Sequence, residues 1–324
     1  MAEVNINSKK VEDKREEVDM NKIDLKVVGS KGIFLRDMFN AKVLVPPGFI
    51  MTSVFEQFME EAGLYARINT IMDASKVSLD DMNSILHASN EIVNLVNNIN
   101  FPKSLETKVL NEFSKLKAEY VAVRPSFIIG DVLSLSLSRE FPSQLNVSSD
   151  NLIRTIKRIW ASSFSPASIA YRLEKNIEMK KPLVALLIQK MIDAEVSGVC
   201  FTSHPITKDR KQIVIEASFG LNEEVNTKGI ARDTYIVDKN NWKILGKTIF
   251  PQKTMLTRVG STTNEVEVGS VLQSKQKLSN AQILSLANLA KRIEDLYDRV
   301  PQKIEWAFEK NNFYIIESQP ISKA

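Results

Sequence analysis

The chain has 324 residues, with 43 Lys plus Arg against 39 Asp plus Glu, and a formal net charge of +4. This length is enough for two domains or two lobes, because single cores stop growing at about 250–300 residues. The basic excess is weak and has no dominant block, which argues against a dedicated nucleic-acid binder. The single cysteine, Cys200, excludes an internal disulfide and favours a reducing cytoplasm, and no apolar run approaches the roughly 20 residues of a membrane helix.

The first twenty residues are rich in charges of both signs and contain no apolar segment. They show no signal peptide, and we expect residues 1–20 to be a disordered tail. Helical patterns dominate the first half of the chain, and strand patterns dominate the second half. We therefore expect an α+β fold with a helix-rich lobe at 21–185 and a strand-rich lobe at 186–324.

A short glycine loop at residues 29–32 carries Lys31 and precedes an amphipathic helix with Phe34, Leu35 and Met38 on one face. A glycine loop at a helix start presents backbone N–H groups, which suit a phosphate, and the lysine would add a charge. The alternative is that these glycines serve only as turn residues.

Residues 53–117 have a helical pattern, and residues 120–123 predict a strand that ends at Arg124. An arginine at a strand end beside a polar loop suits a phosphate, which its guanidinium can bind through two parallel hydrogen bonds. A surface ion pair would explain the same residue.

Apolar or alternating stretches after a helix at 151–171 predict further strands, at residues 183–192, 197–202, 212–218, 234–238 and 242–250. The first of them holds Gln189 and Met191. Cys200 lies between Val199 and Phe201, and we interpret it as a core residue. Ser279 and Gln282 then form a capping box for a helix to residue 297.

Two short runs rich in aromatic and β-branched residues, 303–308 and 313–317, flank a polar Lys-Asn-Asn turn. This pattern predicts a β-hairpin. With the turn centred on Asn311, Glu305 lies opposite Glu317, where like charges repel. A cation held by oxygen ligands, such as Mg²⁺, would offset the repulsion. The alternative is a solvated edge at which both acids point into water.

Eight stretches together resemble the N-terminal ATP-binding domain of the phosphoenolpyruvate synthase and pyruvate phosphate dikinase family. In chain order they are GSKGIFLRDM with VPPGF, VAVRPS, WASSF with YR, IQKM, SGVCFTSHP, IEASFGLNEE, DTYIVDK, and IEWAF with YIIESQP. They cover about residues 22–322 and keep the order and spacing of the family.

The resemblance implies a two-lobed ATP-grasp fold that clamps ATP, with Mg²⁺ as the second cofactor. In the family the lysine of the glycine loop and the arginine of the VR pair contact phosphates, which corresponds to Lys31 and Arg124. The glutamate of IEW and a residue on the facing strand bind Mg²⁺, which corresponds to Glu305 and Glu317.

Three further residues of the nucleotide site follow from the same resemblance. The strand that holds Gln189 and Met191 is similar to the segment that lines adenine, and Glu223 matches an acid of the nucleotide site.

The chain departs from the family pattern at several of these positions. Gln319 stands where an arginine helps phosphoryl transfer, and Lys303 stands where the family has aspartate. The two positions face each other in the expected hairpin register. The positive charge therefore lies on the opposite strand from that of the family arginine. Glu317 replaces a glutamine. The loop from Ser136 to Arg139 has no glycine, although the family has one there, and a side chain would obstruct close approach of the backbone to phosphates.

The family domain phosphorylates a histidine on a separate swivelling domain. The resemblance therefore implies an ATP-dependent phosphotransferase of the dikinase type, with Arg124, Lys31 and Lys303 stabilising the transferring group and a partner protein supplying the phosphohistidine and pyruvate domains. One alternative is a catalytically impaired nucleotide-binding pseudoenzyme that acts as a sensor or scaffold. Another is a binding protein that keeps the fold without ATP.

Overall fold

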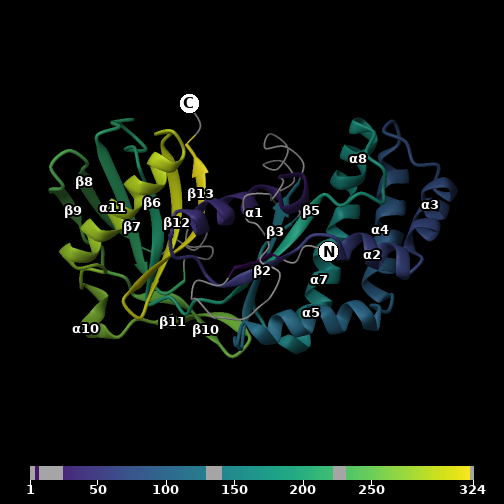
Figure 1. The fold of residues 1–324 in the computed structure, drawn as a ribbon, viewed down its shortest axis with the longest axis horizontal. Coiled ribbons are helices and arrows are strands. Elements are labelled where there is room, and N and C mark those ends of the chain that lie inside the picture. The colour runs from purple at the N-terminus through teal and green to yellow at the C-terminus, as the bar shows by residue number, and fades with distance from the viewer. Residues whose placement is uncertain (1–3, 7–24, 129–140, 222–230, 322–324) are drawn as a thin grey trace. The chain divides into compact units, whose positions relative to one another are not determined.

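The chain forms two compact units, shown in Figure 1. The computed structural model describes residues 4–6, 25–128, 141–221 and 231–321. Unit 1 comprises Met1–Arg36 and Pro47–Met191, and unit 2 comprises Asp37–Pro46 and Ile192–Ala324. The sequence placed a boundary at 185/186, but that cut would fall inside strand β5 (Val184–Lys190), which pairs with neighbours on both sides in unit 1. The change of unit therefore comes after this strand.

Unit 1 contains a five-stranded antiparallel sheet. In sheet order the strands are β1 (Val4–Ile6), β2 (Gly48–Met51), β5 (Val184–Lys190), β3 (Val121–Phe127) and β4 (Gln144–Val147). The central strands β5 and β3 are short, mostly apolar runs whose residues are buried almost throughout, as expected for strands covered on both faces. β1 comes from the segment predicted to be a disordered tail, and its three residues pair with β2 instead.

Strand β3 is longer than the sequence predicts, because it continues beyond Arg124 through Pro125 to Phe127. A proline cannot donate to a ladder and is confined to places where one side of the strand is unpaired. Here β4 pairs with β3 only at Val121 and Val123, so that ladder has ended before Pro125. The other neighbour, β5, pairs with β3 along its whole length.

Helices cover one face of this sheet. They are α2 (Val54–Glu61), α3 (Leu64–Ala74), α4 (Met82–Asn98), α5 (Lys103–Lys115), α7 (Ser149–Ala161) and α8 (Pro166–Lys175), with a 3₁₀ turn, η2 (Ser162–Phe164), between the last two. Phe58 stacks on Trp160 and on Phe101, with ring centroids 5.4 and 5.0 Å apart. These rings share one core with Val123 and Ile188 of the sheet.

Helix α1 (Leu25–Asn40) is kinked at Gly29, which has φ 71° and ψ 179°. The glycine loop predicted before a helix is thus a one-residue interruption between two helical segments. Lys31 lies in the first turn of the second segment.

Unit 2 is built on a six-stranded antiparallel sheet. In sheet order the strands are β13 (Asn312–Pro320), β12 (Gln302–Glu309), β6 (Val196–Phe201), β7 (Gln212–Phe219), β8 (Asp233–Asp238) and β9 (Ile244–Thr248). A separate two-stranded sheet contains β10 (Thr254–Val259) and β11 (Thr262–Glu267), followed by the short helix α10 (Ser270–Gln273). The expectation of an α+β fold is confirmed, with most of the helices in unit 1 and most of the strands in unit 2.

Helix α11 (Asn280–Leu296) packs on β6, β7, β8 and β12 of the larger sheet (Figure 1). It begins with the predicted capping box, in which Ser279 and Gln282 satisfy each other's backbone N–H groups. Its fully buried face includes Ile283, Leu286 and Ile293.

The predicted hairpin is present as β12 and β13, and its turn is one residue tighter than expected. Glu309 pairs with Asn312, so Lys310 and Asn311 form a two-residue turn in which both have positive φ, 48° and 64°. This conformation matches the twist of the flanking strands. A bulge between Glu305 and Trp306 then shifts the register by one residue.

Cys200 in β6 is completely buried, and burial raises the pKa of its thiol, so the predicted core role is confirmed. Within the described ranges, none of the helices has the length and apolar character that a bilayer crossing demands.

Candidate functional site

The kink of α1 is fastened to strand β3 by the Ser126 hydroxyl. Its oxygen accepts hydrogen bonds from the N–H groups of Lys31, at 3.1 Å, and of Gly32, at 3.3 Å, and it donates to the Val28 carbonyl at 2.7 Å. These N–H groups are among those that the glycine loop would offer to a phosphate. They are paired within unit 1, which leaves the Lys31 side chain as the group predicted to meet a phosphate.

Gly29 is required by close packing at this point. A methyl group added there would lie 2.5 Å from the Ser126 carbonyl oxygen and 2.6 Å from that of Phe127. Its φ and ψ also fall in a region that is essentially restricted to glycine. Gly29 is therefore explained by backbone conformation and packing, the turn alternative of the sequence analysis.

Arg124 and Gln189 lie on the same face of the unit 1 sheet. Directly paired residues of neighbouring strands share a face, and Ala122 pairs with Gln189 while Arg124 pairs with Leu187. Because side chains alternate along a strand, this face also carries Ser126, which holds the kink of α1. The apolar residues of the opposite face form the helical core. Two strands from distant parts of the sequence thus bring polar groups to one face.

Arg124 is 7% exposed and Gln189 is 2% exposed. Arg124 is thus buried within strand β3, and its phosphate role stays a prediction. Gly48 of β2 pairs with Gln189, and a methyl group at Gly48 would lie 2.9 Å from Cγ of Gln189, so the glycine leaves room for that side chain. Met191, just after β5, is partly exposed, and its N–H donates to the Tyr120 carbonyl.

Glu305 and Glu317 of unit 2 face each other across the hairpin, as predicted from the sequence. Glu317 is 8% exposed, whereas the side chain of Glu305 is 36% exposed. Cβ atoms of facing residues in an antiparallel pair are about 4.5–5.5 Å apart, and like charges at that distance repel.

Lys303 and Gln319 form the next facing pair, also as predicted. The Lys303 ammonium lies 3.7 Å from a carboxylate oxygen of Glu305, and the Gln319 amide donates to Glu317 at 2.9 Å. Each acid therefore has a polar neighbour on its own strand.

The described residues contain no group of three or more His, Cys, Asp or Glu side chains placed to hold a metal. Two facing carboxylates nevertheless suit Mg²⁺, which commonly keeps several waters and takes one or two carboxylates plus phosphate oxygens. The donor set of Glu305 and Glu317 fits that ion.

The sequence did not reveal a charged pair, Glu216 with Arg232, on the same face of the unit 2 sheet. Val199 pairs with Glu305 on one side and with Glu216 on the other, so the two acids share a face. Glu216 accepts a hydrogen bond from Arg232 at 2.8 Å. With strands about 4.8 Å apart, Glu216 stands about 10 Å from the Glu305 position. Only a strand register reveals this relation, because Glu216 and Glu305 are far apart in sequence.

A buried network holds the base of the hairpin. The Thr202 hydroxyl donates to Glu294 of α11 at 3.1 Å and accepts from the Gln302 N–H at 2.8 Å. Lys239 pairs with Glu294 at 2.8 Å, and the Ser318 hydroxyl donates to the Gln302 side chain at 2.9 Å. The hairpin that carries the two acids is therefore fixed to α11 and β6 by satisfied polar contacts.

Arg172, from the YR stretch of the family resemblance, has a structural role in unit 1. Its guanidinium donates to the carbonyls of Ser163, Glu178 and Lys181 at 3.2, 2.9 and 2.9 Å. It is 1% exposed, and burial lowers its pKa to about 10.

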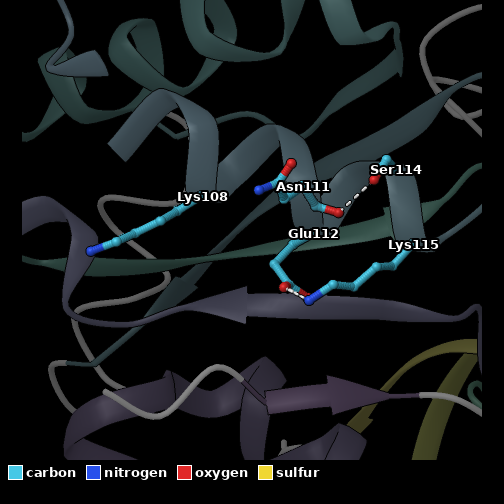
Figure 2. A pocket seen from close by; sticks show the side chains of 5 residues that line it. All are labelled: Lys108, Asn111, Glu112, Ser114 and Lys115. Carbon is cyan, nitrogen blue, oxygen red and sulfur yellow. Dashed lines mark hydrogen bonds and ion pairs between the residues drawn. The ribbon is translucent and has the colours of Figure 1, made fainter. Parts of the chain in front are cut away.

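A shallow hollow of about 380 Å³ on α5 is the pocket shown in Figure 2. Its lining residues are Lys108, Asn111, Glu112, Ser114 and Lys115. Lys115 pairs with Glu112 inside the hollow. None of the residues predicted to bind nucleotide lines this hollow. The charge of Glu112 is neutralised there by Lys115. Glu223 and the loop from Ser136 to Arg139, two other predicted features, lie outside the described residues.

Comparison with known proteins gives a match over residues 25–324 to the family described as pyruvate phosphate dikinase, AMP/ATP-binding domain. The chain is 32% identical over 312 residues to a probable phosphoenolpyruvate synthase of Methanothermobacter thermautotrophicus, covering 94% of this chain and 45% of that protein. It is 31% identical over 351 residues to phosphoenolpyruvate synthase of Pyrococcus furiosus, covering 94% and 43%.

Similarity extends to rifampicin phosphotransferase of Bacillus cereus, with 30% identity over 309 residues, 94% of this chain and 35% of that protein. The chain spans less than half the length of each of these relatives. Strand β1 lies outside the region that matches the family. The resemblance inferred from the eight motifs is confirmed.

Proposed function

Because this chain belongs to the AMP/ATP-binding-domain family of pyruvate phosphate dikinase, we propose that it binds ATP with Mg²⁺ and transfers phosphate to a histidine of a partner protein. The observation that carries the proposal is the pair Glu305 and Glu317, which face each other on one side of the hairpin. Two facing carboxylates suit a divalent cation, and Mg²⁺ held by them with a nucleotide would neutralise charge on phosphate oxygens.

The polar face of the unit 1 sheet provides the proposed phosphate and adenine contacts. Arg124 supplies a fixed cationic fork and Lys31 a mobile charge on the nucleotide phosphates. Gln189 and Met191 contact the adenine, and Glu223 belongs to the same nucleotide site.

In unit 2, Lys303 stabilises charge on the transferring group, while Gln319 contacts the nucleotide without the fixed charge of an arginine. Phosphoryl transfer depends mainly on positioning and electrostatic stabilisation, so these residues, rather than a covalent nucleophile, would carry the reaction. The receiving histidine and the pyruvate domain belong to the proposed partner.

The second candidate is a pseudoenzyme that binds nucleotide as a sensor or scaffold. One contact favours it. The Gln319 amide donates a hydrogen bond to Glu317, one of the two proposed metal ligands. A glutamine used in this way leaves position 319 without a charge directed at a transferring phosphate.

Calorimetry with ATP and MgCl₂ tests binding, and radiolabelled ATP with a purified phosphohistidine-domain protein tests transfer. We expect Glu305→Gln and Glu317→Gln each to weaken binding of Mg·ATP by about tenfold, since each removes one charged ligand. Glu309→Gln is the matched control, because it removes a charge from the same hairpin and keeps the oxygen that accepts the Asp193 N–H.

Unchanged affinity in both variants would refute the metal assignment. Absence of any ATP binding by the wild-type chain would refute both candidates. Binding without labelling of the histidine domain, and without ATP/AMP exchange, would select the pseudoenzyme.

A further inference from the structure

The face of the hairpin that carries the two acids also carries a positive charge of its own. Lys303 and Glu305 are two residues apart on β12, so their side chains project from the same face. Glu317 and Gln319 hold the corresponding positions on β13. Four polar side chains thus form two adjacent facing pairs, which we call the hairpin quartet.

The contacts inside the quartet differ in kind. Gln319 makes a hydrogen bond of 2.9 Å to Glu317, and Glu317 is nearly buried. Lys303 lies 3.7 Å from Glu305, a distance too long for a hydrogen bond, and its side chain is 41% exposed. The lysine therefore acts on Glu305 through its charge and is free to swing into solvent on a flexible stem.

We propose that Lys303 is a resident counter-ion of the carboxylate pair and that a divalent cation binds the pair by displacing it. The inference rests on the proposed metal role of Glu305 and Glu317. With Lys303 present, the quartet carries a net charge of one negative unit, so the hairpin is formed without a metal. A divalent ion entering beside an undisplaced ammonium would meet repulsion at close range. Lys303 thereby sets the metal affinity, and its release from Glu305 makes its ammonium available to a phosphate.

The first experiment is calorimetric titration of the full-length chain with MnCl₂, without nucleotide and again with ATP. We expect Lys303→Met to bind Mn²⁺ about three- to tenfold more tightly than the wild type, because a partly exposed charge a few ångströms away contributes a factor of this order. Lys310→Asn is the matched control: it removes a lysine from the turn of the same hairpin, and asparagine tolerates the positive φ there. Its affinity should equal that of the wild type.

The second experiment measures the thermal midpoint in EDTA and in excess MnCl₂. Lys303→Met should lower the midpoint in EDTA, where Glu305 loses the nearby lysine charge, and Mn²⁺ should restore it. A purely structural role for Lys303 predicts a loss that Mn²⁺ does not restore. In Lys303→Met combined with Glu317→Gln, the loss in EDTA should disappear.

The outcomes separate this inference from the proposed function. If the wild type binds Mn²⁺ and Lys303→Met binds it equally or more weakly, the counter-ion role is wrong and the metal site stands. If neither protein binds Mn²⁺ with or without ATP, both are wrong. If Lys310→Asn binds Mn²⁺ as tightly as Lys303→Met, net charge alone explains the gain and the specific role of Lys303 is refuted.

Discussion

The two candidate regions use their polar groups in opposite ways. At the kink of α1 in unit 1, the N–H groups of Lys31 and Gly32 are paired with Ser126, and glycine provides the space for that contact. On the hairpin of unit 2, Glu305 and Glu317 face each other with a weak ion pair and one amide as neighbours. The same family motifs thus contribute close packing in one region and two facing like charges in the other.

This difference predicts where substitutions will change stability and where they will change ligand binding. Substitutions at the kink of α1 should lower the stability of unit 1, and a ligand should not restore it. Removing a charge from the hairpin should change stability little and metal binding much.

The largest effect is expected for Gly29→Ala, which we expect to lower the free energy of unfolding by about 3 kcal/mol or more. The added methyl group would meet two carbonyl oxygens in a backbone conformation that alanine does not adopt. Gly63→Ala is the control, because Gly63 has a similar φ of 62° and no atom near the added methyl group. It should cost only about 1 kcal/mol. Equal losses in urea denaturation would show that the contact with β3 is not tight.

Arg172→Lys should lower the free energy of unfolding by about 3 kcal/mol, because one ammonium cannot reach three carbonyls held by a planar fork. Arg154→Lys on the exposed side of α7 should stay within about 0.5 kcal/mol. Urea denaturation monitored by tryptophan fluorescence measures both. A small loss for Arg172→Lys would mean that lysine reorganises the three carbonyls around itself.

Ser126→Ala should cost about 2 kcal/mol, since it leaves two N–H donors without their acceptor. Ser89→Ala is the matched control, because Ser89 is equally buried and makes a single bond, to the Phe164 carbonyl. Its loss should be about 1 kcal/mol. Equal losses in the two variants would contradict the capping role of Ser126. If inorganic phosphate restored stability in Ser126→Ala alone, an anion would be taking the place of the hydroxyl.

Glu317→Gln should produce the smallest effect, a gain of about 0.5 kcal/mol in EDTA at low salt, because it removes the like-charge repulsion and keeps an oxygen for the Gln319 amide. In 1 M NaCl the gain should vanish, since screening then acts over about 3 Å. A loss of stability at low salt would indicate that the acids are not repelling each other.

Several elements could be predicted because one local pattern determines each of them. The alternation of aromatic and β-branched residues around Lys310 and Asn311 specifies a hairpin, and Ser279 with Gln282 specifies a helix start. The sequence also predicts the pairing of Glu305 with Glu317. That pairing is correct because two departures from the expected register compensate for each other. The turn is tighter by one residue, and the bulge beside Trp306 shifts the register back. Nothing in the local pattern indicates that bulge.

The features that the sequence did not reveal depend on contacts between distant segments. Strand β3 runs through Pro125 because its second neighbour ends early, and that neighbour is a separate segment of the chain. The pairing of Ser126 with the N–H groups of Lys31 and Gly32 joins segments almost a hundred residues apart. The roles of Arg124 and Gln189 remain predictions, now placed on one buried sheet face.

The outer edge of β13 is contacted by the segment around Leu44, because the Ile315 N–H donates to the Leu44 carbonyl at 2.9 Å. During synthesis on the ribosome, the segment around Leu44 emerges early and must wait for the last strand before this contact can form. Contacts between such distant positions form late and slow the approach to the native state. Unit 2 thus reaches completion only when the hairpin leaves the ribosome, so a truncated product that lacks the two acids also exposes an unfinished sheet to proteases and chaperones.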